Sequence, residues 1–313
     1  MTTGMEYFLV LAEEQSISRA AQRLFVTQQS MSEQMKRLEQ IYGAKLFIRR
    51  PRFQLTAAGE ALLSAARQIR ILEQGLTVQL HNIQEKGGGR LRIGIHATRA
   101  RMFLPQAVEQ FYRVFPNVEL IFFHDDTRDF EQMLLNGDLD LFFGVDAAPF
   151  PEFETISLAE EPIYLIASKS LLERQLGWDL TLPRNTLLPQ ELEQLPLIFS
   201  HDRSNLQQKV DHFFQENSII PRKILTISDF EAQLMLACRD IGACFCPKLM
   251  LQKVQELNNQ NPCNPLHVFP VKGLIWTSQL SLVLHRKAYH SPALLTLIRL
   301  LRESFLTSFS ALV

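Results

Sequence analysis

The 313-residue sequence lacks the features that mark membrane and secreted proteins. No apolar stretch approaches the roughly 18 residues that span a bilayer. The N-terminus has no charged start followed by an apolar run, as a secretory signal would have. Only four cysteines are present, all after residue 237. We therefore expect a cytoplasmic protein with reduced cysteines and no membrane partner.

The sequence also lacks the short motifs of common catalytic and metal sites. It contains no G-x-S-x-G nucleophile elbow, no Walker-type glycine loop and no G-x-G-x-x-G after a strand. Its histidines show no ligand spacing such as H-E-x-x-H. The C-x-C spacing of Cys244 and Cys246 does not match the usual structural zinc sets. We predict no enzyme activity, no catalytic residue, no metal site and no cofactor.

An excess of charge of one sign is also missing, because the formal net charge is -1. The distribution is uneven, however. Residues 1–58 hold eight Lys or Arg against five Glu, a net charge of +3, and the remainder carries -4. A weakly basic head on an acidic body suits a DNA-binding protein whose second half has another task. So small a charge also predicts dimerisation, because one head offers few phosphate contacts.

The N-terminal 43 residues show the pattern of three helices around a small core. Apolar residues recur at helical spacing in two stretches: Met5, Phe8, Leu9 and Ala12, and then Met31, Met35, Leu38 and Ile41. Ser16 and Thr27 are candidate helix caps, and Gly43 can end the last helix. Ala20 and Ala21 allow a close helix crossing, and we expect Leu24 and Phe25 to point into the core. The pattern predicts a helix-turn-helix.

The last of these helices has a polar face opposite its apolar stripe. Gln28, Gln29, Ser32, Glu33 and Lys36 lie on it. Gln can bond adenine bidentately, Ser can bond base edges or phosphates, and Lys suits phosphates. A polar face that is merely solvated is the alternative.

A basic hairpin follows the polar face. Leu46 and Phe47 are expected to anchor it, and Arg49, Arg50 and Arg52 surround Pro51. Such a hairpin beside a recognition helix is a wing, suited to the DNA backbone or minor groove.

Residues 5–60 resemble the winged helix-turn-helix of LysR-type transcriptional regulators. The resemblance rests on SISRAAQRLFVTQQSMS, KRLEQIYGAKLFIRR and LTAAGE, and the layout fits along the whole chain. It implies a dimer, or a tetramer of two dimers, that binds double-stranded DNA. It places base contacts on Gln28, Gln29, Ser32 and Glu33 and a wing contact near Arg52. The full set of expected DNA-binding residues is Thr27, Gln28, Gln29, Ser30, Ser32, Glu33, Lys36, Arg37, Arg49, Arg50 and Arg52.

The sequence departs from the common family pattern at three points. Gln29 stands where the family often has Pro or a small residue, Glu33 where it often has a basic residue, and the wing is about one residue shorter. A carboxylate that faces DNA repels phosphate unless it accepts from a cytosine amino group or pairs locally. Our hypothesis is that Glu33 reads cytosine; the alternative is an ion pair with Lys36 or Arg37.

A long helix is predicted from about Thr56 to Glu85. Its apolar residues recur at steps of three and four: Leu62, Ala66, Ile69, Leu72, Leu76, Leu80 and Ile83. The stripe predicts pairing with the same helix of a second chain, as in the linker helix of the family. Packing against the chain's own body is the alternative. Gly75 marks a potential bend.

We divide the chain into a winged helix-turn-helix at 1–58, a dimerisation helix at 59–86, a glycine hinge at 87–90 and an effector-binding domain at 91–313. From Arg90 on, strands alternate with helices, which predicts an α/β fold with parallel sheets. A late strand pair, near 268–269 and 279–284, suggests two lobes, about 91–164 with 269–313 and about 165–268. The body resembles the periplasmic-binding-protein-like effector domain of the family.

Open α/β sheets bind ligands beyond the carboxyl ends of their strands. Four segments follow such strands, and the expected effector-binding residues are Thr98, Arg99, Thr127, Ser200, His201, Arg203 and Ile227. Hydroxyls, free amides and the arginines suit an anion, whereas Asp125 and Asp126 suit an amine or polyol, so the effector class stays open. For each Ser or Thr an ordinary helix cap is the alternative.

The predicted function is a DNA-binding regulator controlled by a small molecule in its C-terminal domain. One alternative is a redox-sensing regulator of the same family that acts through Cys238, Cys244, Cys246 or Cys263, against which stands their interpretation as small buried residues. A second alternative, an α/β enzyme fused to a DNA-binding head, has no residue in its favour.

Overall fold

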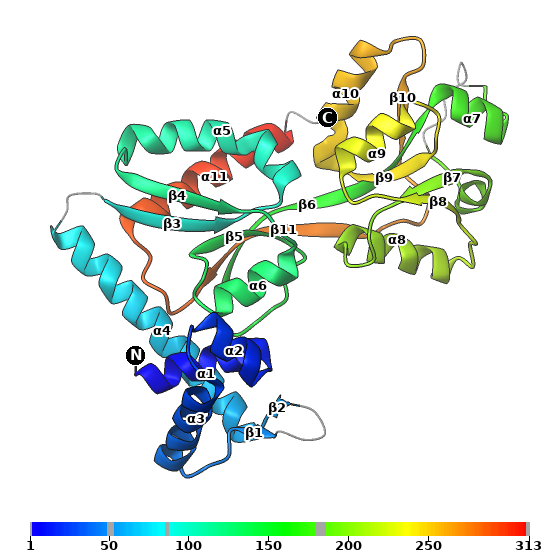
Figure 1. Ribbon diagram of the computed structural model, residues 1–313. Helices are drawn as coiled ribbons and strands as arrows, with labels where there is room; N and C mark the ends of the chain where they lie inside the picture. Colours follow the sequence, from blue (N-terminus) through cyan, green and yellow to red (C-terminus); the bar gives the residue numbers. More distant parts are fainter. Residues whose placement is uncertain (1, 49–52, 85–87, 180–185, 311–313) are drawn as a thin grey trace.

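The computed structural model describes residues 2–48, 53–84, 88–179 and 186–310. Figure 1 shows a small helical head, a long helix α4 and a body of two lobes, each an α/β layer structure. Two strands, β6 and β11, run between the lobes. Among the described residues, no helix is long and apolar enough to cross a membrane.

The head contains the predicted helix-turn-helix and hairpin. Its elements are α1 (Thr3–Glu14), α2 (Ile17–Arg23), α3 (Gln28–Tyr42), β1 (Phe47–Ile48) and β2 (Gln54–Leu55). The Ser16 hydroxyl caps α2 by accepting from the Arg19 amide at 3.4 Å. Gly43 ends α3 with φ of 63°, a left-handed conformation that glycine adopts readily. The helix signals of the sequence are thus confirmed.

The predicted core is confirmed for most of its residues and wrong for two. Met31, Met35 and Leu38 are buried, and Leu24 packs against the same cluster. Phe25, however, is 97% exposed, because its φ of 55° turns the side chain away from the head. Ile41 is 69% exposed, since the last turn of α3 extends past the small core. Helical periodicity cannot detect either effect.

The N-terminal end of helix α4 (Ala57–Gln84) packs against the head. Leu62, Leu63 and Ala66 complete the buried core of the head. A Cβ atom on Gly59 would lie 2.2 Å from the Leu46 carbonyl oxygen, so glycine allows α4 to approach the hairpin closely. Head and helix therefore form one packed unit.

The rest of α4 has one side on the body and one side in solvent. Arg70 bonds the Asn136 carbonyl oxygen, and Lys287 Nζ donates to Gln68 Oε1 at 2.8 Å. Helix α4 runs without interruption through Gly75; a Cβ there would lie 3.1 Å from Tyr289, so glycine permits this contact. The alternative, packing on the body, is thus confirmed for this side of α4, while Leu72, Leu76 and Leu80 of the stripe stay exposed.

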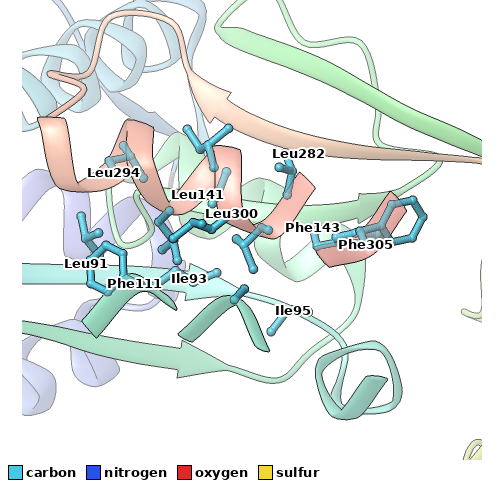
Figure 2. Packing of buried hydrophobic residues seen from close by; sticks show 14 of the residues in the cluster. Leu91, Ile93, Ile95, Phe111, Leu141, Phe143, Leu282, Leu294, Leu300 and Phe305 are labelled. Carbon is cyan, nitrogen blue, oxygen red and sulfur yellow. The ribbon is translucent and has the colours of Figure 1, made fainter. Parts of the chain in front are cut away.

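The first lobe contains five strands in the order β4-β3-β5-β11-β6. The bounds are β3 (Gly89–Gly94), β4 (Val118–Phe123), β5 (Leu141–Val145), β6 (Phe153–Ser168) and β11 (Thr277–His285), with helices α5 (Ala97–Val114), α6 (Thr127–Leu135) and α11 (Pro292–Ser310). Figure 2 shows α11 packed over this sheet, with Leu294 and Leu300 beside Leu91, Ile93 and Leu141. Of the glycine hinge predicted at 87–90, residue 87 lies outside the described residues, and Gly89 and Arg90 already form the start of β3, so movement at this point stays a prediction.

The second lobe continues the same sheet through β6 in the order β6-β9-β7-β8, with β10 paired to β6. The bounds are β7 (Pro196–Phe199), β8 (Arg222–Thr226), β9 (Ala243–Pro247) and β10 (Leu266–Phe269), with helices α7 (Lys169–Leu176), α8 (Asn205–Glu216), α9 (Phe230–Ala237) and α10 (Leu251–Gln260) and the short 3-10 helices η1 (Pro189–Gln194) and η2 (Lys248–Met250). A second apolar core fills this lobe.

The expectation of parallel sheets needs a correction. Pairs β3–β4, β3–β5, β7–β8 and β7–β9 are parallel, but every described pair that involves β6 or β11 is antiparallel. The late strands do not pair with each other: β10 pairs with residues 165–168 and β11 with residues 153–162. One long strand leaves the first lobe and another returns beside it, and their directions are opposite.

Candidate functional site

The first candidate site is the solvent-facing side of α3, which we call the recognition face. It comprises Gln28, Gln29, Ser32, Glu33 and Lys36. Ser32 is half-buried, and the other four are exposed. Thr27 caps the helix by accepting from the Ser30 amide at 3.1 Å, so the first turn is held in place. Arg37 is exposed and Ser30 half-buried beside this face.

Glu33 has a different partner from the one expected. Its Oε1 accepts a hydrogen bond from Gln29 Nε2 at 3.2 Å, one helical turn away. Within the described chain, Glu33 forms no ion pair with Lys36 or Arg37, so that alternative is wrong. The two side chains that depart from the family pattern therefore restrain each other at the centre of the recognition face.

The wing stands next to this face. Strands β1 and β2 pair antiparallel, with Phe47 opposite Leu55. Leu46 and Phe47 are buried, as the sequence predicted for the anchors. The Thr56 hydroxyl donates to the Lys45 carbonyl oxygen at 2.6 Å and ties the hairpin base to the start of α4. Arg49, Arg50 and Arg52 lie outside the described residues, and their DNA contacts remain predictions.

The second candidate site is a cleft between the two lobes of the body. Side chains from both lobes line it around a cavity of about 90 Å³. Six of the seven predicted effector-binding residues line it: Thr98, Arg99, Thr127, Ser200, His201 and Arg203. The seventh, Ile227, does not line the cleft; it packs into the apolar cluster behind α9, and its neighbour Ser228 lines the cleft instead.

The buried polar part of this lining, which we call the cleft floor, comprises Thr98, Arg99, Glu161, Ser200 and Ser278. Arg99 Nη2 donates to Glu161 Oε2 at 2.6 Å, with side-chain exposures of 10% and 0%. Glu161 Oε1 accepts from the Leu249 amide at 3.0 Å. Both carboxylate oxygens are thus satisfied, whereas Arg99 Nη1 is buried and has no hydrogen-bond partner.

Glu161 was missed at the sequence level. It lies on β6, 62 positions from Arg99, and no local spacing links the two. A weak signal exists, because Glu161 is a charged residue two positions before the apolar run that begins at Ile163. A carboxylate at the edge of a buried strand needs a partner, but the sequence does not say which.

The cleft mouth carries exposed charges of both signs. Asp125 and Arg203 are exposed, and Asp126 Oδ2 lies 3.7 Å from His201 Nε2 of the other lobe. His96, by contrast, is largely enclosed, and burial, with the charge of Arg99 as a second cause, lowers its pKa below the usual value. His96 is therefore neutral at pH 7 and adds no positive charge to the cleft.

Three hydrogen bonds fix the backbone segments that line the cleft. The Thr127 hydroxyl accepts from the Val145 amide at 3.1 Å and so fixes the end of β5, not the first turn of α6. The Ser200 amide donates to Gln207 Oε1 at 2.9 Å. Asp229 caps α9 by accepting from the Ala232 amide at 2.8 Å. These bonds hold the strand ends and helix starts that shape the cleft.

The four cysteines are free thiols. Cys244 and Cys246 alternate on β9 and both face one buried apolar cluster. Burial raises the pKa of Cys244 to about 12 and that of Cys246 well above its usual value. Because the thiolate is the reactive form, burial opposes oxidation of both residues. The burial of Cys244 and Cys246 therefore does not support the alternative of a redox-sensing regulator.

Two family models match the chain. The model described as "Bacterial regulatory helix-turn-helix protein, lysR family" matches residues 3–60, and "LysR substrate binding domain" matches residues 84–306. The chain is 26% identical over 309 residues to a "Probable RuBisCO transcriptional regulator" of Synechocystis sp., covering 96% of this chain and 86% of the relative. It is 25% identical over 260 residues to the "HTH-type transcriptional regulator IlvY" of Escherichia coli, covering 80% and 83%.

Solved structures share the fold. A full-length OxyR variant from Pseudomonas aeruginosa matches with a TM-score of 0.63 at 20% identity, covering 96% of this chain and 95% of that one. The crystal structure of CbnR, a LysR family transcriptional regulator, matches with a TM-score of 0.53 at 22% identity, covering 96% and 98%. The chain belongs to the LysR family of transcriptional regulators, has the DNA-binding and substrate-binding domains of that family, and is not an enzyme.

Proposed function

We propose that this regulator binds double-stranded operator DNA through the recognition face, as a homodimer or a tetramer of two dimers. It would act where bacterial DNA lies, in the cytoplasm. The single observation that supports the proposal best is the exposed, capped and polar recognition face of α3. A helix with this surface fits the major groove, where Gln and Ser side chains can reach base edges.

Helix α4 offers the surface for the second copy. Leu72, Leu76 and Leu80 follow each other at steps of four residues and are 58%, 54% and 50% exposed. Together they form an apolar stripe on the side of α4 that is not packed on the body. Pairing two such stripes removes them from water and holds two heads at a fixed spacing, which half-sites on DNA require.

The cleft is the proposed effector site. Its charged lining holds Arg99, Arg128 and Arg203 against Asp125, Asp126 and Glu161, so the formal charges balance. Arginines and helix N-termini favour the anion that the sequence suggests, and the aspartates favour an amine or polyol. An effector that binds one arrangement of the lobes better than the other would shift the spacing of the heads through α4.

The DNA proposal is tested with two variants of the recognition face. Gln28→Ala should weaken binding to the operator about ten- to hundredfold, with little effect on random DNA, because it removes a base contact. Lys36→Ala should weaken binding to all DNA and lower the slope of log affinity against log salt by about 1. Fluorescence anisotropy over a salt series measures both.

Gln40→Ala serves as the control, since Gln40 is also exposed on α3 but was not predicted to touch DNA. Equal losses for Gln28→Ala and Gln40→Ala would contradict the proposed face. The effector proposal is tested separately by a thermal-shift screen of metabolites, in which a cleft ligand raises the melting temperature. A hit that binds equally well with and without operator would refute control by that ligand.

A further inference from the structure

We propose that Glu161 sets the charge selectivity of the cleft: it makes the cleft floor select a neutral hydrogen-bond acceptor of the effector and reject a carboxylate. The inference rests on the proposed role of the cleft as the effector site. It concerns which part of the ligand enters deepest, and it narrows the ligand class that the overall charge of the cleft leaves open.

The first step is the arrangement of charge on the cleft floor. Arg99 is the buried cation that lines the cleft, and it is held by Glu161 at 2.6 Å. Glu161 in turn is fixed from behind by the Leu249 amide of the second lobe. The Arg99 guanidinium also lies over the Phe143 ring, 5.6 Å from its centroid. The pair is therefore rigid, and its two charges stay together.

The second step is the field that a ligand meets there. Coulomb energy falls inversely with distance, so the attraction of an anion to Arg99 is partly offset by repulsion from Glu161, which lies on the other side of the guanidinium. The anion would still lose its hydration on entering a buried site. Burial and the charge of Arg99 lower the pKa of His96 below its usual value and so disfavour a second positive charge beside the floor. A carboxylate on the cleft floor is thus only partly compensated for its lost hydration.

The third step is the hydrogen bond that the floor can offer. Arg99 Nη1 is buried without a partner. A buried donor without an acceptor is destabilising, and a ligand that brings an acceptor would relieve this. A keto, amide or hydroxyl oxygen accepts such a bond without adding a charge. Apolar residues beside the floor, among them Phe130, Leu206 and Phe230, suit an uncharged ligand body.

The fourth step is where charged groups of an effector would lie. Asp125, Arg128 and Arg203 line the mouth and are exposed. Groups that meet these residues keep much of their hydration, so a charge there costs little. The cleft therefore separates the two tasks, with a neutral acceptor bound in the floor and any charged group held at the mouth.

Two probes of equal shape test the proposal: phenylacetamide and phenylacetate. Their binding to the full-length protein is measured by isothermal titration calorimetry at constant ionic strength. Wild-type protein should bind the amide at least tenfold more tightly than the acid. Glu161→Gln keeps an acceptor for the Leu249 amide but removes the negative charge, so phenylacetate should bind at least tenfold more tightly than to wild type. Adding Arg99→Gln to this variant should abolish that gain.

Several results would overturn the inference. These are tighter binding of phenylacetate than of phenylacetamide to wild type, no binding of either probe, or no gain of acid binding in a folded Glu161→Gln variant. If that variant does not fold, the comparison of the two probes on wild type decides alone. Operator binding without probe tests the head, so a failed probe experiment leaves the DNA proposal intact. Failure of every metabolite to alter operator binding would instead refute the effector role.

Discussion

The recognition face of α3 and the cleft floor are opposite kinds of site. On α3 all the polar side chains except the half-buried Ser32 are exposed, and the interaction between Gln29 and Glu33 spans one helical turn. On the cleft floor, Arg99 and Glu161 are buried and come from helix and strand 62 positions apart. The side chains of the first site come from neighbouring turns of one helix and face solvent, whereas those of the second are brought together only by the tertiary fold.

This difference decides what each site contributes to stability. Exposed pairs are screened by water and contribute little, typically less than about 1 kcal/mol. A buried pair contributes little net, but loss of one partner leaves an uncompensated charge in a medium that solvates it poorly. The recognition face should therefore tolerate substitution without unfolding, and the cleft floor should not. The predictions below test this contrast.

The largest effect is expected from Glu161→Ala. It strands the Arg99 guanidinium in the floor and leaves the Leu249 amide without its acceptor, so the free energy of unfolding should fall by about 3–5 kcal/mol. Urea denaturation followed by circular dichroism measures the loss. Glu160→Ala is the matched control, since Glu160 is the exposed neighbour on the same strand, and it should change stability by less than about 0.5 kcal/mol.

A double variant separates charge from packing in this result. Arg99→Leu with Glu161→Leu removes both charges, so it should cost less than Glu161→Ala alone. If Glu161→Ala proved as mild as Glu160→Ala, the floor would be open to water, and the contrast with the recognition face would disappear.

A medium effect is expected where α4 meets a second copy. Leu76→Glu puts a charge in the middle of the exposed stripe, and burial of one leucine is worth about 1.5–3 kcal/mol. The dimer dissociation constant should therefore rise about ten- to hundredfold, with little change in monomer stability. Analytical ultracentrifugation over a concentration series measures it. Thr77→Glu, one position further around the helix and equally exposed, is the control; equal weakening by both would exclude this stripe as the seam.

The head could be predicted from the sequence because its signals are local. Ser16, Thr27 and Gly43 act within one turn of the residues that they cap or end, and the structure has each in that role. The predictions that Phe25 and Ile41 are buried were wrong for a related reason. Periodicity assigns a side chain to one face of a helix, but the left-handed backbone at Phe25 and the limited size of the core lie outside that rule.

In the body the sequence predicted single elements better than their partners. The residues that follow β3, β4 and β7 do line one cleft, since strand ends of an α/β sheet meet at one edge. The pairing of β6 with both β10 and β11 was not predictable, because one strand serves two lobes and its partners lie about 100 residues away or more. The role of Glu161 in the cleft was not predicted for the same reason, because its partner Arg99 lies far away in the sequence.

The smallest effect is expected at Glu33, where a substitution decides whether this side chain reads cytosine or only faces the DNA. Glu33 accepts from Gln29 on the exposed side of α3, and exposed helical pairs of this kind are worth about 0.2–0.5 kcal/mol. Glu33→Ala should therefore leave stability unchanged, keep the ranking of operator variants and tighten all of them about two- to fivefold, because a carboxylate near phosphates is lost. Gln29→Ala controls for loss of the hydrogen bond between Gln29 and Glu33.

Competition binding over operators that differ at single base pairs measures the ranking. If Glu33→Ala instead erased the preference for one C·G pair, at about 1–3 kcal/mol, Glu33 would read cytosine, and its bond to Gln29 would be what aims it.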